Sequence, residues 1–339
     1  MSEEVSTFES ADTPFRLPRN VTPVSYRIHL IPDLEAGTFS GTEDVLINIH
    51  APTREIVLNA CELNVDLAYL SASGSAICGL VETEADAERI RIVFSDEVLA
   101  GEWMLHLCFI GILSDKLHGF YRSSYTDEFG EKHLIAATQF EATDARRAFP
   151  CWDEPALKAV FQVSITAPND LTVLSNTRDT YTSWMGKTKT VHFEPTIRMS
   201  TYLVAFVIGD FESSDMMFVG RNETELRVWC VPGKKHLTQY AQRVAAFNIA
   251  RYEKSYDCPY PGDKLDLIAI PDFASGAMEN LGAITFRETA LLIDEKVASR
   301  AELERVAGVV SHENAHMWFG DLVTMGWWNG IWLNEAFAT

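Results

Sequence analysis

A short histidine motif late in the chain has the residue types and spacing of a metal site. His312 and His316 lie four residues apart, Glu313 follows His312 directly, and Glu335 comes nineteen positions after His316. Two histidines at this spacing share one face of a helix, so both imidazoles can bind one Zn²⁺, and a carboxylate from a second helix completes a His₂Glu shell. Such a shell leaves one coordination site for water, beside which Glu313 is the natural general base. The pattern predicts one catalytic zinc ion per chain.

The surrounding residues favour a zinc site over a chance match. The pattern His-Glu-x-x-His also occurs on ordinary surface helices. Here, however, apolar residues recur at helical spacing before it: Leu303, Val306, Val309 and Val310. The segment from Trp332 to Phe337, which contains Glu335, has the pattern of a buried second helix. We therefore expect two helices that bring the three ligands together.

A second motif suggests what the zinc site acts on. It begins six residues after the apolar, strand-like run 265–270, ends 32 residues before His312, and reads Gly276, Ala277, Met278, Glu279 and Asn280. Glycine lets a backbone approach a substrate closely, and a carboxylate near zinc can hold the charged α-amine of a peptide. Alone, the pentapeptide is better explained as a glycine turn with a solvated glutamate. Next to a zinc motif, it predicts an anchor for a free peptide N-terminus.

Together the two motifs resemble those of the M1 zinc aminopeptidases, a gluzincin family, and the resemblance covers almost the whole chain. The residues from Arg16 to Asp33 resemble the family's opening segment, and those from 327 to 337 resemble its zinc-glutamate helix. Gln139-Phe140-Glu141, with the downstream segment 145–155, resembles a second amine-side motif. By this resemblance, Gln139 and Glu141 join Glu279 around the substrate N-terminus. Gly276 and Ala277 would hydrogen-bond the substrate backbone as an added strand does.

The resemblance implies an α+β fold in two domains. An all-β, saddle-like sheet domain is expected over residues 16–213, followed by the first part of a thermolysin-like α/β zinc peptidase domain over residues 214–339. The residue pattern agrees, since Tyr26, Ile28 and Leu30 alternate with polar residues as in a strand. Later segments predict a strand ending at 230, a helix over 234–256, and strands near 265–270 and 283–286. Residues 1–15 are polar and acidic and are expected to be disordered.

The activity implied by the resemblance is removal of the N-terminal residue from peptides. His312, His316 and Glu335 would hold zinc, and Glu313 would carry a proton from the attacking water to the leaving amine. Two alternatives remain open. A thermolysin-like endopeptidase would use the same zinc site but would gain nothing from carboxylates that bind an α-amine. The second alternative is a truncated protein that binds zinc but is not an enzyme.

Three features depart from the M1 pattern. Asn314 stands where the family usually has Leu or Ile, and its position on the helix should point it into packing, away from the metal. Gly330 replaces a usual acidic residue. The chain ends at Thr339, before the tyrosine that, in the family, stabilises the oxyanion of the tetrahedral intermediate.

Composition and local pattern bound the remaining function classes. The chain is 47% apolar and carries 28 basic and 48 acidic residues, a net charge of −20, which fits a two-domain globular enzyme. This charge repels nucleic-acid backbones and attracts cationic peptide termini, although solubility alone explains it too. The first residues lack a signal-peptide pattern and no stretch reaches the length of a membrane span, so a cytoplasmic enzyme is expected. The oligomeric state cannot be predicted.

Several other reactive residue types are expected to be structural. Asp153 and Glu154 read as a charged turn between two prolines, and Ser200-Thr201-Tyr202 reads as strand packing because no His or Asp is paired with it. The six cysteines lack CxxC spacing and are expected to be single buried thiols: Cys61, Cys78, Cys108, Cys151, Cys230 and Cys258. The other seven histidines have no partners at ligand spacing: His29, His50, His106, His118, His133, His192 and His236.

The 339-residue chain expressed alone should have little or no aminopeptidase activity. It ends before the tyrosine that stabilises the oxyanion in the family, and the loss of one oxyanion donor typically costs about 10²–10³ in rate. Zinc affinity should fall as well, since frayed helix ends hold ligands poorly. The check is an assay of residues 1–339 with an aminoacyl chromogenic amide, beside a chain extended with a homologous C-terminal region. Activity of the short chain within about tenfold of the longer one would contradict the argument.

Overall fold

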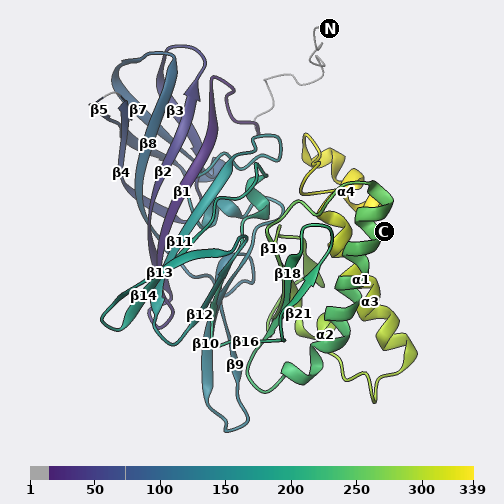
Figure 1. The fold of residues 1–339 in the computed structure, drawn as a ribbon. Coiled ribbons are helices and arrows are strands. Elements are labelled where there is room, and N and C mark those ends of the chain that lie inside the picture. Colours follow the sequence, from purple (N-terminus) through teal and green to yellow (C-terminus); the bar gives the residue numbers. More distant parts are fainter. Residues whose placement is uncertain (1–14, 73) are drawn as a thin grey trace.

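The structure is a computed structural model that describes residues 15–72 and 74–339. Figure 1 shows a large assembly of strands, purple to teal, beside a smaller sheet whose outer side is covered by helices, green to yellow. The expected disordered segment 1–15 lies outside the described residues except for Phe15. Among the described residues, no helix is both long and apolar enough to cross a membrane.

The largest sheet belongs to the first half of the chain. Within the described residues it contains eight strands in the order β13-β14-β11-β1-β2-β8-β4-β5. Neighbours are antiparallel except β1 and β11, which run parallel. The bounds of the strands are β1 Val21–Asp33, β2 Thr38–Ile49, β4 Leu63–Ala72, β5 Ser75–Cys78, β8 Gly101–Ile112, β11 Val160–Pro168, β13 Asp179–Met185 and β14 Thr188–Phe193.

Two smaller sheets complete the β-rich region. Over the ranges that the structure describes, their orders are β12-β15-β10-β9 and β3-β7-β6. The bounds are β3 Thr53–Asn59, β6 Leu80–Glu84, β7 Arg89–Val98, β9 Gly119–Thr126, β10 Lys132–Gln139, β12 Thr172–Ser175 and β15 Phe206–Gly209. The end of β10 bears on the site described below, because Gln139 is its last residue and Glu141 lies two positions further on.

The predicted period-two pattern is confirmed in the strands that build the core. Tyr26, Ile28 and Leu30 of β1 are at most 1% exposed, and the residues between them face outward. Burying every second side chain on one face is how a sheet forms a core while its other face stays polar. Tyr26 lies opposite Phe161 of β11, and the two rings stack with centroids 4.8 Å apart.

The second region is built on a mixed sheet in the order β16-β18-β19-β21-β20, with β17 paired beside β18. Strand β19 is parallel to both neighbours and buried along its whole length, as expected for a strand covered on both faces. The short strand β20 forms an edge of this sheet and pairs only with β21 among the described strands. The bounds are β16 Glu212–Ser213, β17 Met217–Val219, β18 Thr224–Cys230, β19 Lys264–Ile270, β20 Ala277–Met278 and β21 Ala283–Arg287.

These sheets confirm the α+β fold class, with a β-rich domain first and a partial α/β domain second. The chain leaves the first region's sheets at Gly209 and enters the second region's sheet at Glu212. The domain boundary between residues 213 and 214 stays a prediction, and it falls at the end of β16.

Four α-helices lie among the described residues of the second region: α1 Gln239–Tyr256, α2 Glu288–Leu291, α3 Arg300–His316 and α4 Ile331–Ala338. Short 3₁₀ helices also occur: η1 Ala85–Ala87, η2 Ala145–Arg147, η3 Thr201–Leu203, η4 Lys235–Leu237 and η5 Trp328–Gly330. Helix α3 begins with a capping box, in which the Ser299 side chain accepts from the Glu302 backbone and the Glu302 side chain accepts from the Ser299 backbone. Its last turn is the histidine motif, and α1 and α4 pack against it.

The expectation that the second zinc-site helix is buried is wrong for this chain. Helix α4 forms over the predicted residues, but Trp332, Leu333 and Phe337 are 61%, 40% and 55% exposed. A helix that packs on one side buries residues at a spacing of four, and here these are Asn334 and Ala338. Gly330, at the start of α4, offers no side-chain cap. Helix α4 therefore packs against the rest of the described chain through one narrow face.

The structural roles expected for Asp153 and Glu154 are confirmed, but through buried ion pairs and not as an exposed turn. Both side chains are 2% exposed. Asp153 accepts from Arg146 Nε at 2.9 Å, and Glu154 accepts from Arg16 at 2.8 Å and Arg19 at 2.7 Å. Because a buried carboxylate without a partner is costly, these arginines account for the burial.

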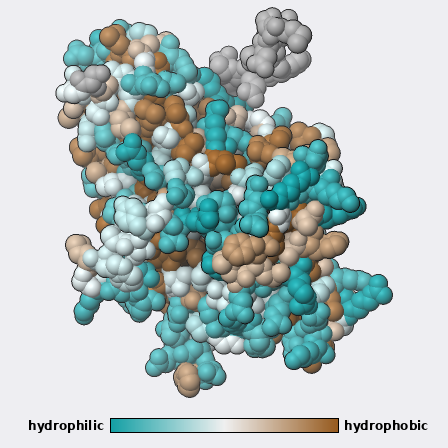
Figure 2. All heavy atoms as spheres, viewed as in Figure 1, coloured by the Kyte–Doolittle hydropathy of each residue, from teal (hydrophilic) through white to brown (hydrophobic). Residues whose placement is uncertain are grey.

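The expectation that the cysteines are single thiols is confirmed, but the expectation that they are buried is wrong for four of the six. All six cysteines are free thiols, but only Cys151 and Cys230 are buried, and Cys78 is exposed. On the face seen in Figure 2, hydrophilic side chains cover most of the surface and apolar ones form small scattered groups. This distribution fits the net charge of −20.

Asn314 lies where the sequence predicted, fully buried in α3 and away from solvent, and neither amide atom is hydrogen-bonded to any residue that the structure describes. We predict that Asn314→Leu, which keeps a similar branched shape, raises the free energy of unfolding by about 1–3 kcal/mol, because no unpaired amide remains. Urea unfolding midpoints measure the change. The matched control is Asn248→Leu, whose amide donates to Ser311 Oγ at 3.1 Å, so that this substitution should destabilise the chain. A loss of stability in both variants would contradict the prediction.

Candidate metal centre and substrate-binding site

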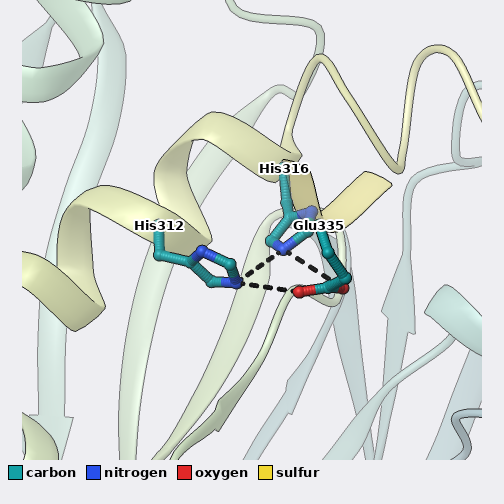
Figure 3. Close-up of side chains that lie close together, drawn as sticks. All are labelled: His312, His316 and Glu335. Carbon is teal, nitrogen blue, oxygen red and sulfur yellow. Dashed lines mark hydrogen bonds and ion pairs between the residues drawn. The ribbon is translucent and has the colours of Figure 1, made fainter. Parts of the chain in front are cut away.

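Helices α3 and α4 bring the three predicted metal ligands together (Figure 3). His312 and His316 lie one turn apart on α3, with their Nε2 atoms 3.0 Å apart. Glu335 reaches them from α4, with its Oε2 3.3 Å from His312 Nε2 and its Oε1 3.8 Å from His316 Nε2. Figure 3 shows all three side chains pointing to one place.

These atoms fit a zinc ion. Ligand atoms bound to tetrahedral Zn²⁺ at about 2.0–2.2 Å lie about 3.3–3.5 Å from one another, close to the separations found here. His316 Nδ1 must donate to the Phe319 carbonyl, 2.9 Å away, so the neutral ring turns the lone pair of its Nε2 toward the shared point. Burial lowers the pKa of both imidazoles, and the neighbouring imidazole lowers that of His312 further. Neutral imidazole is the form that binds a metal.

Glu313 lies beside the ligands as the general-base role requires. Its side chain is 5% exposed, and oxygen or nitrogen atoms of Glu313, Glu279 and His316 lie within 4.8 Å of one another. Burial, followed by the charges of Glu279, Glu335 and Glu141, raises the pKa of the Glu313 carboxyl well above its usual range. A carboxyl group with a raised pKa holds a transferred proton more readily.

Two further carboxyl groups gather at the same point from different parts of the fold. Glu141 follows β10 of the β-rich domain, Glu279 follows β20, and both have an oxygen within 4.8 Å of a Glu335 oxygen. Burial, then the charges of Glu279 and Glu335, raises the pKa of Glu141 to about 8. Burial, opposed by a backbone hydrogen bond and reinforced by Glu335, raises the pKa of Glu279 to about 7. The cluster therefore favours the binding of cations.

The other predicted substrate-binding residues divide into two groups. Gly276 and Ala277 lie at the partly exposed edge of the second sheet, and a Cβ built on Gly276 meets nothing within 4 Å. The edge can therefore accept the backbone of an extended peptide. Met278 and Asn280, in contrast, are 1% exposed. Asn280 donates to Thr285 Oγ1 at 3.2 Å, which points to a role in holding the turn rather than in touching the substrate.

Gln139 contacts Met278 of the buried group and also offers a polar atom for substrate binding. Its Nε2 donates to Met278 Sδ at 3.3 Å, and its Oε1 is buried without a hydrogen-bond partner among the described residues. An unpaired buried acceptor two residues before Glu141 is suited to receive a hydrogen bond from an ammonium group.

The structure also brings together residues that the sequence analysis did not connect. Asp127, Glu131 and His133 offer ligand-type atoms within 4.8 Å of one another on the β9–β10 hairpin. Asp127 Oδ1 accepts from two backbone N–H groups of the turn, and its Oδ2 lies 3.0 Å from His133 Nε2, so the turn itself explains the cluster. The spacing of these three residues, four positions and then two, was the sequence signal that could have indicated the cluster.

Comparison with known proteins decides the family. The chain matches the model of the Peptidase M1 N-terminal domain over residues 22–203 and that of the Peptidase family M1 domain over residues 240–339. The chain belongs to peptidase family M1. The M1 family is generally zinc-dependent, in agreement with the ligands described above.

Relatives with curated names support the same family. The chain is 46% identical over 324 residues to Aminopeptidase M1-B of Oryza sativa subsp. japonica, 45% identical over 332 residues to Aminopeptidase M1 of Arabidopsis thaliana, and 41% identical over 329 residues to Puromycin-sensitive aminopeptidase of Caenorhabditis elegans. Each alignment covers 96% of this chain, but only 37%, 37% and 34% of the respective relative. The chain thus spans little more than a third of the length of these relatives.

The zinc site is tested by removing one ligand. We predict that His316→Ala lowers the zinc content from about one ion per chain to nearly none, because the two ligands left cannot close the shell. Elemental analysis after dialysis measures the content. His133→Ala is the matched control, since it removes an imidazole from the hairpin cluster and should leave the zinc content unchanged. Equal zinc content in the His316 variant and the unmodified chain would refute the assignment.

Proposed function

We propose that the site belongs to a zinc-dependent aminopeptidase that removes the N-terminal residue of peptides. The observation that carries the proposal is the position of the buried Glu279 and the half-buried Glu141, whose carboxyl groups lie within 4.8 Å of the proposed metal ligand Glu335. A peptide bound by its α-ammonium at this point can reach the metal with its first peptide bond only. An endopeptidase would have no use for such an anchor.

The residues of this chain divide the work as follows. His312, His316 and Glu335 would hold Zn²⁺, which when bound lowers the pKa of water and polarises a carbonyl group. Glu313 takes the proton of the attacking water and passes it to the nitrogen of the leaving amine. Its burial keeps bulk solvent away from that proton.

The amine anchor fixes where cleavage occurs. Glu279 and Glu141 accept hydrogen bonds from the α-ammonium, and the unpaired Oε1 of Gln139 offers another acceptor. The edge formed by Gly276 and Ala277 pairs with the peptide backbone as an added strand does. Binding at two points orients the first peptide bond, and orientation of this kind supplies much of the rate enhancement in enzymes.

Peptides with a free N-terminus are accordingly the proposed substrates. The negative charge of the chain is unfavourable for nucleic acid, which we do not propose as a partner. The cytoplasmic location expected from the sequence stays a prediction.

The decisive test separates the amine anchor from the zinc site. We predict that Glu279→Gln, in a protein extended with the C-terminal region of a relative, lowers kcat/KM for free peptides by about tenfold to a hundredfold, because a charge-assisted hydrogen bond is worth about 1.5–3 kcal/mol. Turnover of N-acetylated peptides should change far less. Glu304→Gln, at an exposed α3 position that forms an ion pair with Arg300, is the control and should change neither.

Two results would count against this proposal. Equal losses for free and N-acetylated peptides would make Glu279 a structural residue. Efficient cleavage of N-acetylated peptides at internal bonds by the unmodified protein would favour an endopeptidase.

A further inference from the structure

The hydroxyl-rich segment Ser200-Thr201-Tyr202 forms no part of the strand packing that the sequence predicted. It begins the 3₁₀ helix η3, and all three side chains are at most 1% exposed. Ser200 Oγ donates to the Pro155 carbonyl at 2.7 Å, and Thr201 Oγ1 donates to the Trp152 carbonyl at 3.1 Å. These two hydroxyl groups hold the segment within its own domain. The Tyr202 hydroxyl, in contrast, points into the second domain.

Tyr202 makes two hydrogen bonds there, to different sides of the proposed metal centre. Its hydroxyl donates to the Gly320 carbonyl at 3.3 Å and accepts from Asn334 Nδ2 at 3.2 Å. Its ring packs edge-on against Trp328, with centroids 5.4 Å apart. Burial above all raises the pKa of this phenol well above its usual value, so the hydroxyl keeps its proton and can donate and accept at once.

The first of these bonds supports the histidine side of the centre. Gly320 lies in the turn after α3, where His316 Nδ1 donates to the Phe319 carbonyl at 2.9 Å and Asp321 N donates to the His316 carbonyl at 3.0 Å. The turn therefore sets the orientation of the His316 ring. A side chain at position 320 would come within 3.1 Å of His316 Nδ1, at a backbone φ of +143° that suits glycine. Little freedom remains between this turn and the ligand.

The second bond supports the carboxylate side. Asn334 immediately precedes Glu335 in α4 and is 2% exposed. Most of the apolar side chains of α4 face solvent, so side-chain packing alone restrains this helix weakly. A hydrogen bond from the neighbouring residue to a buried phenol fixes both the rotation of α4 and its distance from α3.

Lys158 adds a second contact from the β-rich domain to the same turn. Its Nζ donates to the Asp321 carbonyl at 3.0 Å and to the Leu322 carbonyl at 3.1 Å. Three consecutive carbonyl groups after the histidine helix, those of residues 320–322, thus receive hydrogen bonds from Tyr202 and Lys158. The β-rich domain holds the turn that follows the metal-binding helix.

We propose that Tyr202 is a positioning residue of the metal centre, which joins the turn behind His316 to the helix carrying Glu335 through one hydroxyl group. Lys158 supports the same turn from the surface. The inference rests on the proposed zinc site and adds that the β-rich domain sets the geometry of this site. Groups that orient metal ligands in this way are typically worth about 10–100-fold in metal affinity.

The test uses Tyr202→Phe in the 339-residue chain, because phenylalanine keeps the ring packing and removes only the hydroxyl. Zinc affinity is measured by competition with a chelator, and the absorption spectrum of bound Co²⁺ reports the ligand geometry. We expect zinc affinity to fall by about 10–100-fold and the Co²⁺ bands to change in position and intensity. A purely structural role would lower the urea midpoint without changing the spectrum.

The matched control is Tyr240→Phe. The Tyr240 hydroxyl donates to the Leu303 carbonyl at 3.2 Å, so this variant also removes one phenol–carbonyl hydrogen bond to α3, but far from the ligands. It should leave zinc affinity and the Co²⁺ spectrum unchanged. Asn334→Ala should reproduce part of the loss seen in Tyr202→Phe, and the double variant should lose less than the sum, because both single variants remove the Asn334–Tyr202 hydrogen bond.

The outcomes separate this inference from the proposed function. If the unmodified chain binds zinc but Tyr202→Phe binds it with affinity within about twofold and an unchanged spectrum, the inference is wrong and the zinc site stands. If neither the unmodified chain nor the chain extended with the C-terminal region of a relative binds zinc, the proposed function fails and the inference with it. Should Tyr202→Phe not fold, Lys158→Met replaces it. A several-fold loss of affinity in that variant supports the inference, and an unchanged affinity overturns it.

Discussion

The accumulation of negative charge in a partly buried site is the constraint on which the functional arrangement depends. Glu141, Glu279 and Glu313 lie together near Glu335, and the charged groups that raise their pKa values are other carboxylates. Burying ionised groups without partners is costly, so such a cluster is stable only if protons or cations occupy it. In the proposed function, a zinc ion and a peptide α-ammonium would supply this positive charge. The free energy that the chain loses by burying them is recovered on binding.

The fold brings these groups together from three separate elements. Glu141 comes from the end of a strand in the β-rich domain, Glu279 from the free edge of the second sheet, and Glu335 from α4. No one of these elements contains a complete site. The relative placement of the two domains is therefore part of the site's chemistry, and the hydrogen bonds from Tyr202 and Lys158 act on that placement.

Periodic and local features of the site were predictable from the sequence, whereas its long-range contacts were not. The helical spacing before His312 predicted α3, and the motif spacing predicted which three ligands meet. The exposure of Trp332 could not be predicted, because the apolar pattern of a helix does not reveal what covers it. Tyr202 bonds to residues 118 and 132 positions away, and no local pattern carries that information. The segment around Tyr202 predicted strand packing, because no His or Asp is paired with its hydroxyl groups in the sequence.

The two halves of the proposed metal centre are held by different forces, and this difference explains why hydrogen bonds matter most at α4. Helix α3 is fixed by its capping box and by Val306 and Val310, buried side chains that resist displacement. Within the described part of the chain, helix α4 buries little besides Asn334 and Ala338, so packing inside this chain leaves its rotation weakly determined. A rotation of a few degrees moves a long glutamate side chain by several tenths of an ångström, which is about the tolerance of zinc coordination. The Asn334–Tyr202 hydrogen bond supplies the restraint that packing does not, since it fixes the residue next to the ligand.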